Sequence, residues 1–233
     1  MGESGMEVIM SDFNDAEREA VYKAISLRRD IRRQFEPTPI AKDILVRILS
    51  AAHRAGSVGF MQPWDFVLIE DYATRENVLD SFLRERNRAA EFYDSQRKEL
   101  FLSLKLEGIL ESALNICVTC DRSRGGPHVL GRSSILETDL YSTCCAVQNL
   151  WLAARTEGIG VGWVSILDPE ELKRILGLPD QVVPVAYLCM GYVRQFPPGP
   201  ELERAGWRQR LPLSGLVHLN RWENKAGETW ETS

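Results

Sequence analysis

The sequence predicts one domain that combines α-helices and β-strands, of the α/β or α+β class. Its 233 residues are long for one domain and short for two. Hydrophobic residues make up 44% of the chain, which is enough to bury a substantial core. Segments with helical spacing of apolar residues alternate with short apolar runs that are typical of buried strands. We therefore expect a single domain over residues 1–233.

Five segments have the composition or the apolar spacing of helices. Residues 135–158 carry a nearly continuous apolar face, which predicts a central helix. Residues 73–104 are polar with few apolar anchors, and we expect them to pack loosely. The other three predicted helices are shorter, and they span residues 14–28, 41–55 and 169–176.

Four apolar runs predict strands, and the chain ends in a different composition. The runs are bounded by turn residues and are rich in β-branched and aromatic side chains. From Phe196 onward Pro, Gly and charged residues dominate. This composition predicts a C-terminal arm, 196–233, that runs over a surface or onto a partner subunit. The predicted strands span residues 64–70, 115–121, 160–167 and 182–193.

Charge and hydropathy exclude several classes of protein. The net charge is -5, and no Lys/Arg-rich stretch lacks interleaved acids, so we expect no nucleic-acid partner. The first 20 residues are acidic and lack the apolar core of a signal peptide. No apolar run approaches the roughly 20 residues that cross a bilayer. We expect a cytoplasmic protein that has no membrane partner.

Neither the cysteines nor the histidines predict a metal site. The five cysteines are an odd number in a reducing compartment, which favours free thiols. Cys117 and Cys120 form a C-x-x-C, but they lie in an apolar run, where strand alternation places them in the core. His53, His128 and His218 are far apart in sequence and lack metal-ligand spacing.

Two arginine-rich segments are candidates for binding an anion. Residues 28–33 contain four arginines beside a predicted helix end, and guanidinium groups bind phosphate through paired hydrogen bonds. In the tail, Arg208 and Arg210 lie on one face of an extended segment. The alternative for both segments is a basic surface that faces water.

Two glycine-rich segments are candidates for contacting a flat ligand. In residues 56–64, glycines allow close approach of the backbone, and Ser57 and Gln62 supply polar groups. An ordinary helix-to-strand turn is the alternative. Residues 158–165 are also glycine-rich but lack the Lys-Ser/Thr of a phosphate-binding loop, so we reject an NTPase reading.

In order and spacing, these four segments resemble the FMN-dependent nitroreductase-like flavoproteins across nearly the whole chain. Their motifs R-R-S-x-R, P-S-x-x-N-x-Q-P-W, G-x-G-x-x-W and K/R-x-R-L-P match the segments that begin at residues 28, 56, 158 and 208. The resemblance implies an α+β, nitroreductase-like fold with a central, mainly antiparallel sheet flanked by helices. It also implies a domain-swapped homodimer with FMN at the subunit interface.

The resemblance further implies which residues bind FMN. Basic side chains hold its phosphate, and the two glycine-rich segments flank its isoalloxazine ring. The phosphate ligands would be Arg28, Arg29, Arg32, Arg208 and Arg210, and the ring contacts would be Ser57, Met61, Gln62, Gly162, Trp163 and Val164.

Two departures from the general motif narrow the resemblance. Asp30 stands where common nitroreductases have Ser or Thr, and Phe60 stands where they usually have Asn. The strings RRDIRRQF, GSVGFMQPWDF, LKLEGI and GIGVGWVSIL resemble the subfamily of 5,6-dimethylbenzimidazole synthases. That resemblance implies catalytic roles for Asp30 and Ser165 in breaking the flavin down. The alternatives are that Asp30 forms an ion pair with Arg28 or Arg32, and that Ser165 only contacts the flavin.

The subfamily resemblance also implies a reaction, in which reduced FMN is the substrate and O2 the co-substrate. An external flavin reductase would supply the reduced FMN. The polar, helix-rich segment 84–107 is a candidate lid that excludes water from the flavin. A pair of surface helices is the alternative for this segment.

Three other functions remain open on the sequence. The nearest is an NAD(P)H-dependent nitroreductase or flavin reductase, with recycled FMN and a structural Asp30. A dehalogenase of the iodotyrosine type is less favoured, because residues 84–107 lack a convincing cluster for gripping a zwitterionic amino acid. A flavin-binding module without catalysis would need the arginines but neither Asp30 nor Ser165.

Overall fold

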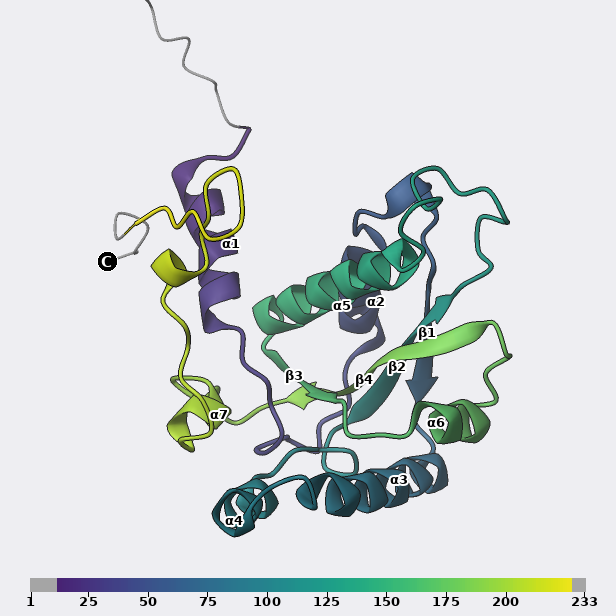
Figure 1. Ribbon diagram of the computed structural model, residues 1–233. Coiled ribbons are helices and arrows are strands. Elements are labelled where there is room, and N and C mark those ends of the chain that lie inside the picture. Colours follow the sequence, from purple (N-terminus) through teal and green to yellow (C-terminus); the bar gives the residue numbers. More distant parts are fainter. Residues whose placement is uncertain (1–11, 228–233) are drawn as a thin grey trace, which may run out of the picture. The chain divides into compact units, whose positions relative to one another are not determined.

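A computed structural model of the chain describes residues 12–227 and divides into two compact units, one up to Phe196 and one from Pro197 onward. The first unit has three layers, with a sheet between two layers of helices (Figure 1). The acidic N-terminal segment lies largely outside the described residues, as do the last six residues of the predicted arm.

The sheet contains four strands in the order β1-β2-β4-β3, and every neighbouring pair is antiparallel. This arrangement confirms the predicted α+β class and its antiparallel sheet. An isolated parallel bridge between Asp30 and Val161 adds the segment after the first helix to the outer edge of β3. The strands are β1 (Trp64–Ile69), β2 (Leu114–Asp121), β3 (Ile159–Val164) and β4 (Val182–Tyr192).

The upper helical layer is organised by α5 (Thr138–Thr156), the predicted central helix. It packs with α2 (Lys42–His53) over one face of the sheet, while α1 (Asp15–Leu27) has no buried residue (Figure 1). Buried aliphatic side chains of both α2 and α5 meet those of the sheet. The core between them includes Ile48, Val147, Leu150, Ile116 and Leu188.

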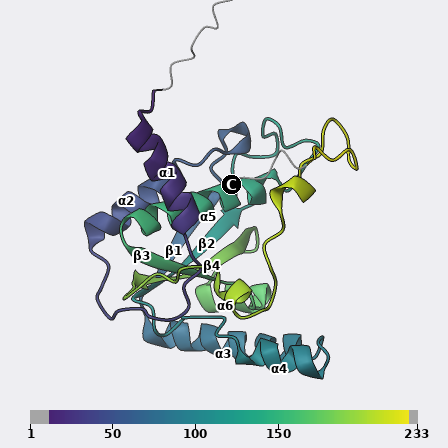
Figure 2. The same ribbon diagram turned by 90° about the vertical axis from the view of Figure 1, so that its left-hand side faces the viewer.

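The lower layer contains α3 (Tyr72–Ala90), α4 (Ser95–Ser103) and α6 (Pro169–Leu176), with α3 and α4 following one another below the sheet (Figure 2). The prediction that residues 73–104 pack loosely is wrong for α3. Val78 and Phe82, one helical turn apart, are both buried in a second core. In α4 only Phe101 is buried.

The shorter elements and the cysteines complete the fold. A 3-10 turn, η1 (Val58–Phe60), precedes β1, and the second unit contains α7 (Glu201–Arg204) and the turn η2 (Leu213–Gly215). All five cysteines are free thiols, as predicted. Cys117 and Cys120 are buried on β2, and burial raises their pKa values to about 12 and about 11. Within residues 12–227, the helices are all too short or too polar to cross a membrane.

Candidate active site

The segment that leaves α1 lies directly against the edge of β3. The backbone N–H of Ile31 donates to the carbonyl of Val161 at 3.0 Å, and the N–H of Trp163 donates to Oδ1 of Asp30 at 3.0 Å. A Cβ atom at Gly162 would lie 2.0 Å from the carbonyl oxygen of Ile31, which only glycine avoids. The structure therefore joins the first arginine motif to the second glycine-rich segment.

Asp30 and Arg32 form an ion pair within this segment. Their side chains are 29% and 11% exposed, so the pair is largely shielded from solvent. The alternative that Asp30 pairs with an arginine of its own motif is thus seen in the structure. The Nε of Arg32 is buried and has no hydrogen-bond partner among the described residues.

Trp151 of α5 organises the first two arginines, and the sequence analysis did not single it out. Its indole N–H donates to the carbonyl of Arg29 at 3.2 Å, and the guanidinium of Arg28 lies 4.6 Å from the centre of its ring. Arg29 itself donates to the carbonyls of Ser26 and Arg28, each at 2.7 Å. These contacts fix the course of the chain where it leaves α1.

A further arginine, Arg155, joins this cluster one helical turn after Trp151. Its Nε donates to the carbonyl of Leu27 at 3.0 Å, and its guanidinium lies 3.7 Å from the ring centre of Phe196. Burial and the neighbouring positive charge of Arg29 lower the pKa of Arg155. Arg155 belongs to none of the motifs in the sequence, and its spacing from Trp151, which places both on one helix face, is the one signal for it.

The second glycine-rich segment ends at the predicted catalytic serine. Gly162 and Val164 are buried, Trp163 is half-buried with its ring centre 6.3 Å from that of Trp151, and Ser165 is exposed. Strand β3 stops at Val164 instead of residue 167, so Ser165 begins the loop to α6. A pocket of about 270 Å³ opens there, lined by Trp163, Val164, Ser165, Leu167, Pro169, Leu172, Pro184, Val185, Ala186 and Tyr187.

The first glycine-rich loop is held in a fixed conformation before β1. The Oγ of Ser57 accepts a hydrogen bond from the N–H of Gln62 at 3.1 Å, and Met61 is buried. Phe60 and Gln62 have positive φ values of 53° and 46°, which side-chain-bearing residues rarely adopt. Phe60 is 83% exposed at the tip of the loop.

This loop and the arginine segment lie at opposite ends of α5 (Figure 1). The N–H of Val58 donates to Oγ of Ser142 at 3.2 Å, whereas Arg28 packs on Trp151. From position 142 to position 151 an α-helix rises roughly 13 Å, at 1.5 Å per residue. One chain therefore brings together the predicted residues of segments 28–32 and 162–165, but it leaves Ser57, Met61 and Gln62 apart from them.

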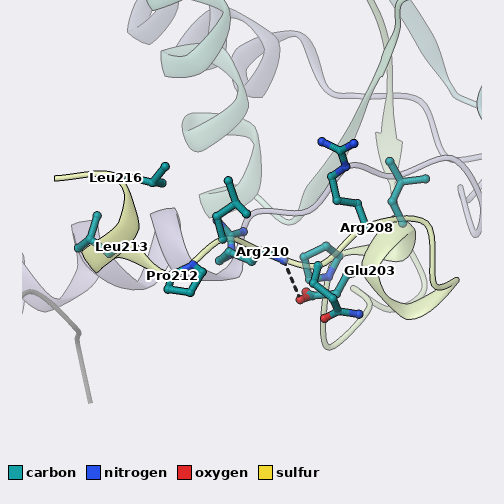
Figure 3. A pocket seen from close by; sticks show the side chains of 10 residues that line it. Glu203, Arg208, Arg210, Pro212, Leu213 and Leu216 are labelled. Carbon is teal, nitrogen blue, oxygen red and sulfur yellow. Dashed lines mark hydrogen bonds between the residues drawn. The ribbon is translucent and has the colours of Figure 1, made fainter. Parts of the chain in front are cut away.

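The tail arginines lie in the second unit. Arg208 and Arg210 line a hollow of about 890 Å³ within it, and the N–H of Arg210 donates to the carboxylate of Glu203 at 3.3 Å (Figure 3). The other lining residues are mainly apolar. They are Pro200, Leu202, Glu203, Gln209, Leu211, Pro212, Leu213 and Leu216.

A family model and two known proteins are similar to this chain over most of its length. Residues 25–192 match the Nitroreductase family. The chain is 41% identical to 5,6-dimethylbenzimidazole synthase of Rhodospirillum rubrum over 200 residues, which cover 86% of this chain and 94% of that protein. It is 37% identical to the synthase of Rhodobacter capsulatus over 201 residues, which cover 86% of this chain and 97% of that one.

The fold has solved counterparts. Iodotyrosine deiodinase bound to FMN and 3-iodo-L-tyrosine superposes with a TM-score of 0.64 at 21% identity, covering 76% of this chain and 92% of that one. At this identity the likeness establishes the shared fold. The chain therefore belongs to the nitroreductase family, and within it is similar to the 5,6-dimethylbenzimidazole synthases.

Proposed function

We propose that this chain is a 5,6-dimethylbenzimidazole synthase that fragments reduced FMN in a reaction with O2. The observation that carries the proposal is the junction between Asp30 and β3, which holds a carboxylate within reach of the segment that ends at Ser165. The named synthase relatives, similar over most of the chain, support the same function. Reduced FMN would arrive from an external flavin reductase.

The arginines fit the phosphate of FMN. Arg28, Arg29 and Arg155 gather where α1 ends, and the like charge of Arg29 is one cause of the lowered pKa of Arg155. A phosphate would relieve this repulsion by accepting hydrogen bonds from the guanidinium groups. The unsatisfied Nε of Arg32 is a fourth donor. Arg208 and Arg210 of the second unit stay proposed phosphate ligands.

We propose a homodimer in which the loop 57–62 of a second copy completes the flavin site. This arrangement follows from the separation of that loop from the arginine segment along α5. Its second support is α1, which has no buried residue and exposes an apolar face. The exposed apolar side chains of α1 are Val21, Tyr22, Ile25 and Leu27.

Bound reduced flavin would supply the electrons for the reaction with O2. The chain's own groups would handle protons and orientation. Oδ1 of Asp30 stays on the N–H of Trp163, so Oδ2 is the atom that would accept a proton from the ribityl chain. That transfer requires Arg32 to turn from Oδ2 toward the phosphate. The exposed hydroxyl of Ser165 would donate a hydrogen bond near N5 of the flavin.

We retain segment 84–107 as a lid over the site. Two arginines near its start make contacts. Arg84 pairs with Glu171 of α6, and Arg86 donates to the carbonyl of Leu102, which ties α3 to α4. Phe92, at the turn between α3 and α4, is 84% exposed and would pack when the lid closes on a flavin.

The test is to incubate the purified protein in air with FMN and a reducing system, and to look for 5,6-dimethylbenzimidazole by mass spectrometry. We expect the product to appear with a matching loss of flavin. The Asp30→Asn variant serves as the control for product formed without the enzyme's chemistry. If the flavin stays intact while this protein oxidises NADPH steadily, the assignment is wrong.

The second candidate is an NAD(P)H-dependent nitroreductase or flavin reductase. One observation favours it. Asp30 forms an ion pair with Arg32, as expected of an acid whose role is only structural. In that enzyme FMN is recycled, and the charge of Asp30 is dispensable for turnover. The Asp30→Asn variant would then reduce nitro compounds at the wild-type rate.

A further inference from the structure

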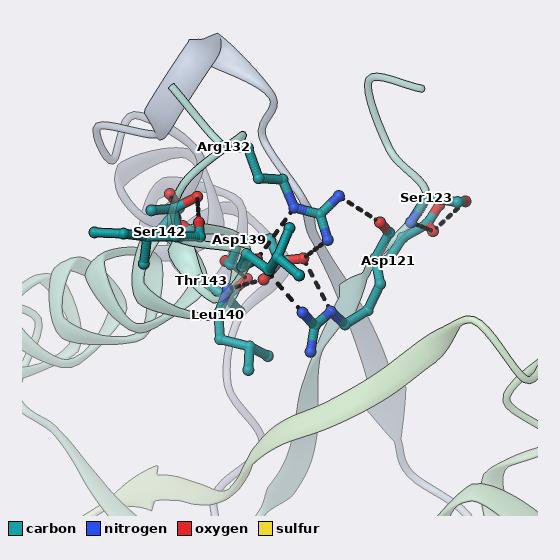
Figure 4. Close-up of polar contacts among 11 residues, drawn as sticks. Asp121, Ser123, Arg132, Asp139, Leu140, Ser142 and Thr143 are labelled. Carbon is teal, nitrogen blue, oxygen red and sulfur yellow. Dashed lines mark hydrogen bonds and ion pairs between the residues drawn. The ribbon is translucent and has the colours of Figure 1, made fainter. Parts of the chain in front are cut away.

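A buried carboxylate lies at the start of α5, far from the arginine segment. The side chain of Asp139 is 1% exposed, and its Oδ2 pairs with Nε of Arg122 at 3.0 Å and with Nη2 of Arg132 at 2.6 Å (Figure 4). Its Oδ1 accepts a hydrogen bond from the N–H of Leu140 at 2.7 Å. Every direct contact of this acid is therefore structural.

Arg132 uses its remaining N–H groups to close the loop between β2 and α5. It donates to the carbonyl of Arg122 at 2.8 Å and to that of Leu136 at 3.1 Å (Figure 4). The two ends of the loop 122–137 are thus fastened to one guanidinium, and Asp139 holds that guanidinium by its charge. Without the carboxylate, the partly buried guanidinium groups of Arg122 and Arg132 would lose their shared counter-charge, and the loop would lose its anchor.

The anchored loop forms one wall of the first glycine-rich loop. A Cβ atom at Gly59 would lie 2.6 Å from the carbonyl oxygen of Leu130 and 2.6 Å from Cγ1 of Val129. A Cβ atom at Gly131 would lie 3.0 Å from a methyl group of Val58. The two loops therefore pack closely, through the carbonyl of Leu130 and the side chains of Val58 and Val129, and the shape of one depends on the other.

The first turns of α5 hold the same loop from a second side. The hydroxyl of Ser142 donates to the carbonyl of Thr138 at 2.6 Å and accepts the N–H of Val58 at 3.2 Å. Asp139 lies between these two positions on the helix. Its ion pairs hold the loop 122–137, and the hydrogen bond of Ser142 holds the turn that ends at Gln62.

We infer that Asp139 is a positioning residue that sets the affinity for FMN by fixing the loop 57–62 through Arg132 and the loop 122–137. The inference rests on the proposed role of loop 57–62 in flavin binding. A buried carboxylate with two arginines contributes little net stability, because desolvation offsets the attraction. A unique arrangement of the adjoining loops is what the cluster supplies.

The experiment compares Asp139→Asn with the wild-type protein by hydrogen exchange and by FMN titration. Asn keeps the shape but removes the charge. We expect the amides of Val58 and Gln62 to exchange at least about tenfold faster, while amides of the β2–β4 pair are unchanged. The dissociation constant of oxidised FMN should rise at least about tenfold. The rate of product formation at saturating FMN should change less than about threefold.

The control is Arg75→Gln, which removes a buried, hydrogen-bonded arginine from the lower layer. Arg75 donates to the carbonyls of Ile69, Ser112 and Ala113 at 2.9 to 3.1 Å. This variant should lose stability yet keep the wild-type FMN affinity. An FMN affinity that falls in both variants by the same factor would overturn the inference, because it would reflect stability alone.

A milder variant covers the case in which Asp139→Asn does not fold. Arg132→Lys keeps a charge beside Asp139 but loses the bonds to Arg122 and Leu136, and it should weaken FMN binding several-fold. Unchanged affinity and unchanged exchange at Val58 would refute the positioning role. A wild-type protein that binds FMN but forms no product would refute the proposed reaction and leave this inference standing.

Discussion

The carboxylate of Asp30 accepts the backbone N–H of Trp163 at 3.0 Å, so the proposed catalytic base also fastens the chain to β3. One oxygen serves the backbone and the other pairs with Arg32. The two duties can be separated by substitution, because an amide oxygen can replace the first contact but not the second.

Asp30→Asn should therefore keep the fold and bind FMN within about threefold of the wild-type affinity. Product formation should fall by at least about 100-fold, the range expected for loss of a general base. FMN titration and mass spectrometry of 5,6-dimethylbenzimidazole measure the two effects. If this variant formed product at the wild-type rate, a catalytic role for Asp30 would be ruled out.

Ser165→Gly should also suppress product while leaving FMN binding and thermal stability nearly unchanged. Ser165 is exposed and follows the last paired residue of β3, so its removal opens no core cavity. Single-turnover assays with pre-reduced FMN are the appropriate measurement. A normal product yield would reduce Ser165 to a contact residue.

Gly162→Ala should destabilise the protein by more than about 2 kcal/mol, because its methyl group would overlap the carbonyl of Ile31. Chemical denaturation measures the change in the free energy of unfolding. Gly56→Ala is the control, since a Cβ atom there meets nothing within 4 Å and φ is not positive. It should alter stability by less than about 0.5 kcal/mol.

Arg155→Gln should raise the dissociation constant of FMN by roughly tenfold or more, as expected when one charge-assisted hydrogen bond is lost. The effect should shrink at high salt, because the wild-type affinity itself falls there. Arg174→Gln on the exposed face of α6 is the control and should bind FMN normally. An equal loss of FMN affinity in both variants would show that the net charge of the protein, and not a specific site at Arg155, causes the effect.

Stability should fall as the pH rises from about 9 to 12. Burial raises the pKa of Cys117 to about 12 and that of Cys120 to about 11, above the ordinary value of 9.0. Below pH 9 both thiols are protonated in the folded and unfolded states, and their contribution to the free energy of unfolding is fully present. Above it the unfolded chain releases protons that the folded chain retains, which favours unfolding. Thermal melts across this range test the prediction, and replacing both cysteines with Ala should flatten the slope.

The regular elements were readable from the sequence because each depends on local pattern. The bounds of α6 agree with the prediction, and those of β1, β2 and β4 differ by one residue at most. Helix α5 begins at Thr138 instead of residue 135, because the carbonyls of Ile135 and Leu136 bond to side chains of the loop and of Thr138.

The site was readable only in part. Segments 28–32 and 162–165 were identified by motif, but their contact depends on the close approach that Gly162 permits. Arg155 and Asp139 were missed, because the groups they bond to lie on other elements, far away in the sequence. The ion pair of Asp30 with Arg32 was one of the two alternatives for this residue, because an acid among arginines has partners at hand within its own motif.

The hydrogen bond from the N–H of Ile31 to the carbonyl of Val161 affects the tendency of the protein to aggregate. An uncovered edge strand offers a row of backbone donors and acceptors to any other extended chain, and it is a common seed of aggregation. Here the segment after α1 occupies the outer side of β3 with one backbone bond and one charged side chain. A variant that detaches this segment would therefore form insoluble assemblies before it lost its secondary structure.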